Sequence, residues 1–135
     1  MVTEDGYILA VYRIPGKLGE EPSVENKPPV YMQHGLLDSA DAWIMNYPEV
    51  APAFVASTQG YDVWLNNTRG NTYSRKHVTL DPDSEAFWNF DWQEMGKYDV
   101  NGVLDYIIEE TGYSKVAYVG HSQGTTQMFY ALSEF

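Results

Sequence analysis

The chain has 135 residues, which is enough for one domain at most. Of these residues 44% are hydrophobic and 20% are charged, a composition typical of a globular domain. Eight Lys and Arg against nineteen Asp and Glu leave a formal charge of −11, which argues against nucleic acids and anionic lipid headgroups as ligands and leaves uncharged ligands open. Cysteine is absent, which excludes disulfides, a cysteine nucleophile and a thiolate metal site.

The first half of the chain predicts strands separated by a loop and a helix. Residues 7–14 alternate and predict an early antiparallel strand, and residues 15–29, rich in Gly and Pro, predict a surface loop. Residues 30–35 form a short apolar run ending in Gly, which is typical of a buried parallel strand. A helix stopped by its final Gly is expected over residues 50–60, and the next strand over residues 61–67.

The second half continues the alternation. Residues 68–90 predict a long irregular stretch, which in a compact domain is more often functional than idle. Residues 91–111 carry apolar side chains at three- and four-residue steps and predict an amphipathic helix that ends at Gly112. A strand over 115–120 and a helix from residue 122 follow. The pattern predicts the α/β class: a mostly parallel sheet flanked by helices, with an early antiparallel strand.

One short motif in the last part of the chain indicates chemistry. Residues 120–124 read Gly-His-Ser-Gln-Gly, which matches the G-x-S-x-G pattern of a nucleophile elbow. The five-residue pattern alone is modest evidence, but an apolar strand runs into it and a helix leaves it. Ser122 is expected in a strained turn, where side chains at positions Gly120 and Gly124 would collide with neighbouring backbone. The alternative interpretation is a tight turn in which Ser122 only caps the helix.

An oxyanion formed on such a serine needs two N–H donors held by rigid backbone. The residue after the nucleophile supplies one donor, here Gln123, and the loop after an earlier strand supplies the other. The sequence His-Gly-Leu-Leu at residues 34–37 ends an earlier strand, and the Leu36 N–H is the natural second donor.

Together these segments resemble the acid lipase family, which includes gastric lipase, lysosomal acid lipase and the related steryl ester hydrolases. The resemblance runs from Val2 to about Phe129 and rests on VTEDGYIL, QHGLLDSADAWI, GYDVWLNNTRGN, DSEAFWNFDWQEMGKYDV and GHSQGTTQ. It implies that residues 1–135 are part of an α/β-hydrolase domain, including the N-terminal lipase-associated segment and ending just after the elbow. It also implies hydrolysis of neutral lipid esters, either triacylglycerol or steryl ester, through an acyl-enzyme, without a cofactor or metal.

The same resemblance implies Ser122 as nucleophile and Leu36 and Gln123 as oxyanion donors. The implied partners are the lipid ester, a lipid–water interface and the missing C-terminal part of the same enzyme. A secreted or lysosomal location rests on the resemblance alone.

The residues after the serine depart from this family. They contain no His and no Asp, and Glu134 is their only carboxylate side chain, so the triad base and its orienting acid are missing. None of the three histidines is expected to replace the base: His121 should point away, His34 should position or pack, and His77 should be a solvated surface residue. The chain alone is therefore expected to be nearly inactive.

Two other interpretations remain open. In the first, the chain is a truncated or split lipase-like product that binds lipid or a partner without turnover. In the second, the same elbow supports a thioesterase or acyltransferase reaction. In the α/β-hydrolase order the strand at 30–35 lies centrally, so the strand at 115–120 would present an unpaired apolar edge. That edge favours completion by further polypeptide.

A few remaining residues are assigned structural roles. Asn66 begins a formal glycosylation sequon, but burial or backbone capping is the favoured interpretation. Arg69 is expected to pair with a loop carboxylate, and Asp38 and Asp41 to cap. The four Trp residues are expected in the core rather than along an acyl-chain pocket.

Overall fold

A computed structural model describes residues 1–21, 25 and 27–134. Its four strands form one sheet in the order β1-β3-β2-β4, with β1 antiparallel to β3 and the other pairs parallel. This confirms the α/β class and the central position of the first parallel strand. The strands are β1 (Val11–Ile14), β2 (Pro29–Gln33), β3 (Asp62–Asn66) and β4 (Ala117–Gly120).

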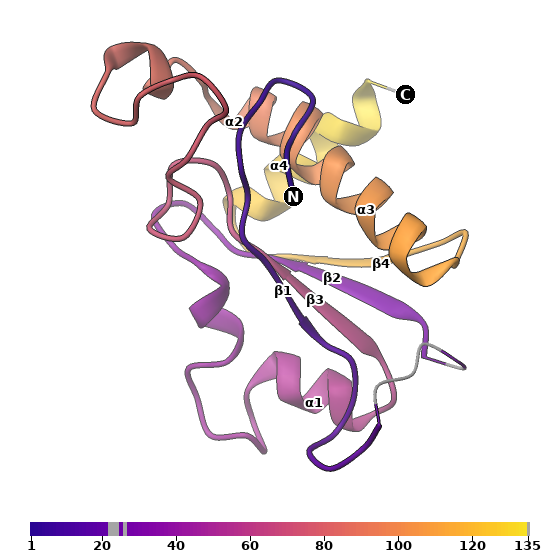
Figure 1. Cartoon of the computed structure of the whole chain (residues 1–135). Coiled ribbons are helices and arrows are strands. Elements are labelled where there is room, and N and C mark those ends of the chain that lie inside the picture. The colour runs from indigo at the N-terminus through magenta and orange to yellow at the C-terminus, as the bar shows by residue number, and fades with distance from the viewer. Residues whose placement is uncertain (22–24, 26, 135) are drawn as a thin grey trace.

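Helices cover both faces of this sheet (Figure 1). One face carries α1, and the other carries α2, α3 and α4, as an α/β sheet built from parallel strands requires. None of the described helices is long and apolar enough to cross a membrane. The helices are α1 (Pro52–Thr58), α2 (Trp92–Glu94), α3 (Asn101–Thr111) and α4 (Gln123–Ser133), with 3-10 turns η1 (Ala40–Trp43) and η2 (Glu85–Trp88) and a π-helical segment η3 (Met95–Val100).

Alternation along the two central strands divides the core into two clusters. Tyr31 and Trp64 belong to the cluster under α3 and α4, while Val30, Met32 and Leu65 belong to the cluster on the α1 face. Because successive side chains of a strand point to opposite faces, each central strand contributes to both clusters. All residues of β2 and β3 are buried, which explains the apolar residues at the centre of each strand.

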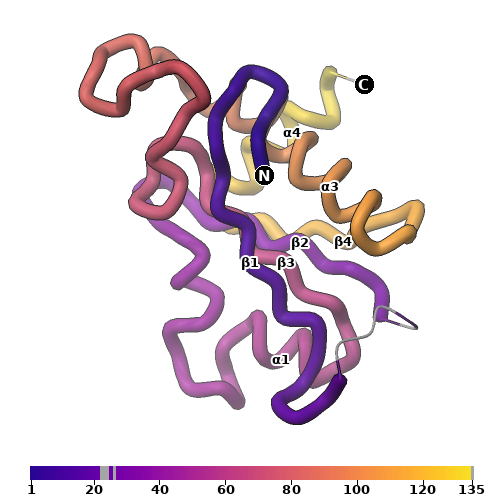
Figure 2. The backbone as a smooth tube through the Cα atoms, in the orientation of Figure 1, coloured from indigo at the N-terminus to yellow at the C-terminus, as the bar shows by residue number. Residues whose placement is uncertain are grey.

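The expected first strand is shorter than predicted. Residues 7–10 lie outside β1, and Tyr7 instead forms an isolated bridge with His77 in the long loop. Figure 2 shows the N-terminal segment running beside that loop. The Ala10 N–H donates to the Ser74 Oγ at 3.0 Å instead of joining a ladder. The alternating side chains are therefore buried against a loop, which the sequence pattern alone cannot distinguish from a strand.

The predicted helix at residues 91–111 is continuous but not regular. It begins with a capping box at Asp91 and Glu94, passes through η3 and continues as α3 to Gly112, which ends it with φ +71°. A Cβ on Gly96 would lie 2.7 Å from the Gln127 carbonyl oxygen of α4. Gly96, which weakens the helical pattern, is thus required for the close approach of η3 to α4.

The predicted loop at 15–29 is only partly described, since residues 22–24 and 26 lie outside the described residues.

Candidate functional site: an exposed serine in a strained turn

Ser122 lies between β4 and α4 with φ +52° and ψ −120°, a conformation that L-residues rarely adopt. Among the described residues, Ser122 and Leu37 are the only ones other than glycine with a positive φ. Ser122 is exposed, and its side chain makes no capping hydrogen bond to α4. The interpretation of Ser122 as a simple helix cap therefore has no support in the structure.

Two glycines allow this turn to pack against the end of β2. A Cβ on Gly124 would lie 2.6 Å from the Gln33 carbonyl oxygen and 2.7 Å from that of His34. A Cβ on Gly120 would lie 2.9 Å from the Thr125 backbone nitrogen. The predicted collisions with backbone are thus confirmed at both positions.

The loop after β2 lies directly against the serine. The His121 N–H donates to the Gln33 carbonyl at 3.0 Å, which extends the β2–β4 pairing to the turn. A Cβ on Gly35 would lie 3.1 Å from the Ser122 Cβ. The next residue, Leu36, and Gln123 both line the cavity beside the turn. The structure therefore brings together the residues that the sequence singled out as nucleophile and donors.

His34 fixes the peptide that carries the Leu36 N–H. Its Nδ1 lies 2.8 Å from the Gly35 carbonyl oxygen, and its Nε2 lies 3.1 Å from the Thr68 backbone nitrogen. The carbonyl can only accept and the N–H can only donate, so the ring is neutral with its proton on Nδ1. Burial lowers the His34 pKa and favours this neutral form. Because the peptide is trans, holding the Gly35 carbonyl directs the Leu36 N–H to the opposite side.

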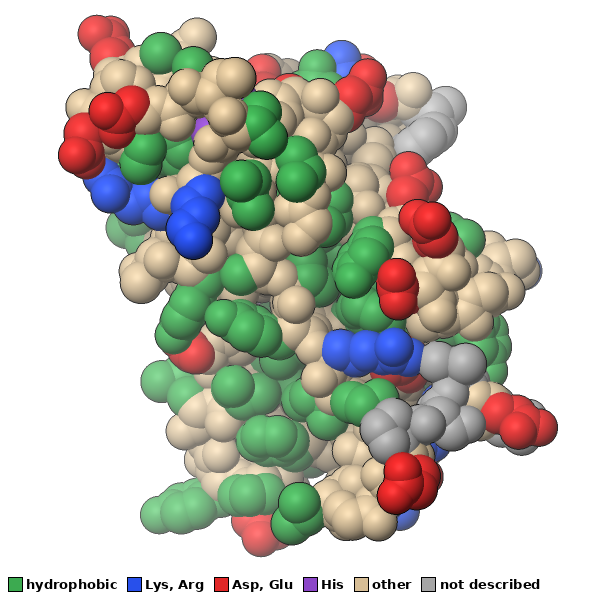
Figure 3. All heavy atoms as spheres, in the orientation of Figure 1, with side chains coloured by type: hydrophobic (Ala, Val, Ile, Leu, Met, Phe, Trp, Pro, Cys, Tyr) green, Lys and Arg blue, Asp and Glu red, His purple; other side chains and the backbone are tan. Residues whose placement is uncertain are grey.

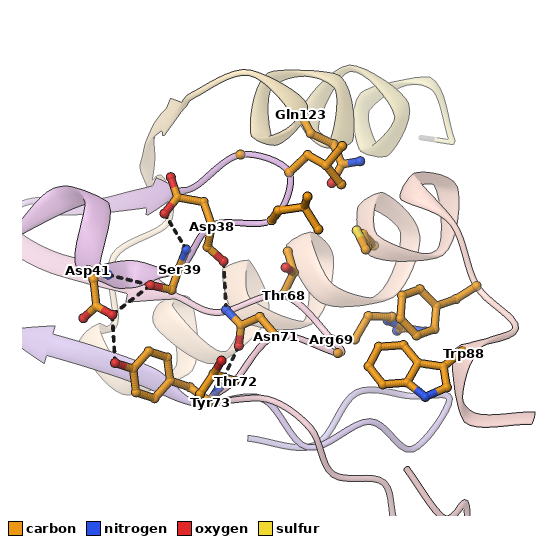
Figure 4. A pocket seen from close by; sticks show the side chains of 16 residues that line it. Asp38, Ser39, Asp41, Thr68, Arg69, Asn71, Thr72, Tyr73, Trp88 and Gln123 are labelled. Carbon is orange, nitrogen blue, oxygen red and sulfur yellow. Dashed lines mark hydrogen bonds between the residues drawn. The ribbon is translucent and has the colours of Figure 1, made fainter. Parts of the chain in front are cut away.

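A cavity of about 610 Å³ opens beside the turn (Figure 4). Leu36, Leu37, Trp88 and Phe90 contribute apolar walls, and Gln123 lies at one end. Trp88 is 44% exposed, so this tryptophan lines the cavity instead of the core. The volume is within the range of roughly 300–1,000 Å³ that is usual for small-molecule sites.

The core prediction for the four tryptophans is half right. Trp43 and Trp64 are buried, whereas Trp88 and Trp92 are exposed by 44% and 39%. Trp92 contacts Tyr130 edge-to-face, with ring centroids 5.6 Å apart. Both exposed tryptophans lie in or directly after the long loop, where few elements cover them.

Arg69 is a buried cation at the wall of this cavity. Its Nε donates to Asp99 Oδ1 at 2.8 Å, and its Nη1 donates to Asp5 Oδ2 at 2.6 Å. Its guanidinium lies over the Tyr7 ring at 4.0 Å. Burial raises the Asp99 pKa to about 6, and Arg69 opposes that rise. Arg69 therefore pairs with two carboxylates, Asp5 near the N-terminus and Asp99 in η3, where the sequence predicted one.

Sequence reasoning missed Asp99, although a signal was present. Asp99 lies four residues after Met95 and four before Val103, both buried, so it occupies the apolar face of the helix pattern. A carboxylate on such a face is rarely tolerated without a cation. Asp5 carries no comparable signal.

His77 and His121 form no hydrogen bond to the Ser122 side chain among the described residues. His77 is half-buried: its Nε2 lies 2.9 Å from the Asp5 carbonyl oxygen, and its Nδ1 accepts from the Thr79 N–H at 3.0 Å. The prediction of a solvated surface His77 was wrong, because the loop folds around this ring. His121 is exposed, directly before the serine.

Of the remaining structural predictions, burial of Asn66 is confirmed and capping by the two Asp residues is not. Asn66 is fully buried and donates to the Tyr31 hydroxyl at 3.0 Å, as the burial interpretation requires. Asp38 accepts from the N–H of the next residue, Ser39, at 2.8 Å, which is not a helix cap. The cap of η1 is Ser39, whose hydroxyl accepts from the Asp41 N–H at 3.2 Å, so the capping roles predicted for Asp38 and Asp41 were wrong. Asp41 accepts from the Ser39 hydroxyl at 2.9 Å and also from the Tyr73 hydroxyl at 2.8 Å, which the sequence did not indicate.

Comparison with known proteins agrees with this geometry. Residues 28–135 match the family described as alpha/beta hydrolase fold, and residues 1–47 match the partial alpha/beta-hydrolase lipase region. Gastric triacylglycerol lipase of Rattus norvegicus is 53% identical over 133 residues, and lipase member K of Homo sapiens is 52% identical over the same length. The chain belongs to the α/β-hydrolase fold family, in its acid lipase group. The resemblance found in the sequence is thereby confirmed.

The chain spans about a third of the length of the relatives that it matches. The alignments cover 98% of the chain but 34% of the rat lipase and 33% of the human protein. Among solved structures, a putative epoxide hydrolase from Pseudomonas aeruginosa superimposes with a TM-score of 0.59 at 18% identity, over 98% of this chain and 36% of that one. The Bacillus licheniformis lipase BlEst2 superimposes with a TM-score of 0.56 at 27% identity, over 91% of this chain and 40% of that one.

Proposed function

We propose that the protein carrying this chain is a serine hydrolase that cleaves neutral lipid esters through an acyl-enzyme. The observation that carries the proposal is Ser122, an exposed hydroxyl held at φ +52° between a strand and a helix. Such strain persists where the surrounding structure enforces it, and it is concentrated at active sites. The lipid ester as substrate is supported by the gastric lipases among the relatives.

In the proposed reaction, the Ser122 Oγ attacks the ester carbonyl carbon and its proton passes to a general base. The N–H groups of Leu36 and Gln123 stabilise the resulting oxyanion, aided by the positive end of α4. The alcohol leaves with the proton from the base, and water then hydrolyses the acyl-enzyme. We assign no base within these 135 residues, because His34 is held by two backbone contacts, and both ring nitrogens of His77 are occupied by backbone groups of Asp5 and Thr79. The base and its carboxylate are proposed to come from further polypeptide.

The experiment is active-site labelling and hydrolysis in the full-length protein. A fluorophosphonate should label Ser122, and Ser122→Ala should lower the turnover of a short-chain ester on the order of a million-fold. Ser133→Ala is the matched control, since this exposed serine lies at the other end of α4 and should leave turnover intact. Labelling at another residue would contradict the proposal. Lipid binding with no turnover would instead favour the non-catalytic alternative.

The open edge of the sheet and the exposed apolar side chains of α4 fit the proposal and that alternative equally well. Among the described strands, β4 pairs with β2 alone, and its Val119 is 39% exposed. On α4, Phe129 and Leu132 are exposed by 69% and 62%. These apolar groups suit a contact with further polypeptide, whether or not that polypeptide completes the site.

A further inference from the structure

A second cavity lies away from the serine, between β1, η1, β3 and α1. Its volume is about 380 Å³, again within the usual range for small-molecule sites. Its lining is dominated by apolar and aromatic side chains: Tyr12, Ile14, Ala40, Ile44, Phe54 and Leu65, together with Asp41 and Tyr73. We call this second cavity the β1–α1 groove. Neither the serine motif at residues 120–124 nor the sequence at residues 34–37 contributes to its lining.

The groove and the cavity beside Ser122 share a wall. Asp41 and Tyr73 line both, and the Tyr73 hydroxyl donates to Asp41 Oδ2 at 2.8 Å. Figure 4 shows this pair at the side of the cavity opposite Gln123. Both residues are exposed, so water can replace their hydrogen bond and the wall can open at little cost. Tyr12 packs edge-on against the Tyr73 ring at 6.1 Å and continues the wall into the groove.

We infer that the β1–α1 groove binds the distal part of the hydrocarbon chain of an uncharged long-chain ester whose carbonyl lies at Ser122. The inference rests on the proposed function, which it deepens by assigning a subsite for chain length. Three features support this occupant: the apolar lining, the shared wall, and the Asp41 carboxylate on a chain of charge −11, which disfavours anionic ligands. A chain entering from the serine would cross the Asp41–Tyr73 wall.

The surroundings of the groove favour a hydrocarbon ligand as well. Figure 3 shows apolar side chains gathered over the η1–α1 half of the molecule. Met45, Tyr47 and Val50, in the segment between η1 and α1, are exposed by 80%, 77% and 59%. Each methylene moved from water to an apolar site strengthens binding by about four-fold at most. A few methylenes in the groove therefore suffice to distinguish long from short chains.

The test measures kcat/KM of the full-length protein for p-nitrophenyl esters of sixteen and four carbons. Ile44→Trp, which fills the groove, should lower the long-to-short ratio by about ten-fold or more. Tyr73→Ala, which removes the wall, should raise it. Val55→Trp is the matched control: Val55 is 38% exposed on α1 and lines neither cavity, so the ratio should stay unchanged.

An unchanged ratio in Ile44→Trp overturns the inference while leaving the proposed function intact. A lowered melting temperature with an unchanged ratio would mean that Ile44 serves only core packing, which also overturns it. Binding of a neutral pyrene-labelled long-chain ester to the Ser122→Ala protein separates the two proposals. If the parent protein hydrolyses neither ester but Ile44→Trp still abolishes this binding, the function fails and the subsite stands.

Discussion

Replacing Arg69 by Met should destabilise the protein strongly at neutral pH. The guanidinium is 1% exposed and bridges Asp99, which is fully buried, and Asp5, which is partly exposed. Met keeps an unbranched apolar stem but removes the charge. Among the described residues, Asp99 would then keep the backbone N–H of residue 69, at 3.0 Å, as its one hydrogen-bond donor. Removing one partner of a buried ion pair costs about 3–5 kcal/mol, and we expect a loss in that range.

This loss should depend on pH in a defined direction. Burial raises the Asp99 pKa to about 6, and without the opposing Arg69 it should rise further. A carboxyl whose pKa is raised on folding contributes stability below its unfolded pKa of 3.8, and that contribution is lost as the pH rises through the folded pKa. The difference between Arg69→Met and the parent should therefore shrink as the pH falls from 7 toward 4.

Urea unfolding at several pH values measures both effects. Arg75→Met is the matched control: Arg75 pairs with Asp83 at 2.8 Å, but these side chains are 47% and 82% exposed, so the loss should be below about 1 kcal/mol. Adding Asp99→Asn to Arg69→Met should recover much of the stability at pH 7. Equal losses in the two single variants, or a loss independent of pH, would refute the account of Arg69 as the counter-ion of a buried carboxylate.

Two further predictions concern the turn itself. Gly124→Ala should cost about 1–3 kcal/mol in urea unfolding, because its Cβ would meet the Gln33 carbonyl at 2.6 Å and backbone cannot move aside cheaply. Gly102→Ala, whose Cβ would meet only the Met1 side chain at 3.1 Å, should be neutral or stabilising, and a reversed order of the two would contradict this. His34→Phe should lower kcat for a short-chain ester by about 10- to 100-fold with little change in KM, less than deletion of a donor. A change confined to KM would show that His34 does not position the oxyanion peptide.

Much of the fold followed from the sequence because its parallel strands are locally encoded. The runs that became β2 and β3 have apolar centres and are preceded by Pro or Gly, so the residue pattern and the turn residues gave the same prediction. The segment at 7–10 was assigned wrongly because its side chains are buried by a loop distant in sequence. The same distance hid the link between Asp5 and Arg69, which are 64 residues apart. No local pattern encodes such a partner.

The elbow was recognisable because its glycines reflect a steric requirement that survives in sequence. Gly35, Gly120 and Gly124 let the ends of β2 and β4 and the start of α4 converge on Ser122. The support behind that helix was not recognisable, because it depends on contacts across elements. Gly96 allows α4 to pack closely against η3. The same segment, η3, contains Asp99, which forms an ion pair with Arg69. A buried ion pair with no contact to the serine therefore braces the helix that positions it, so the Arg69 variants should also weaken the reactivity of Ser122 toward a fluorophosphonate.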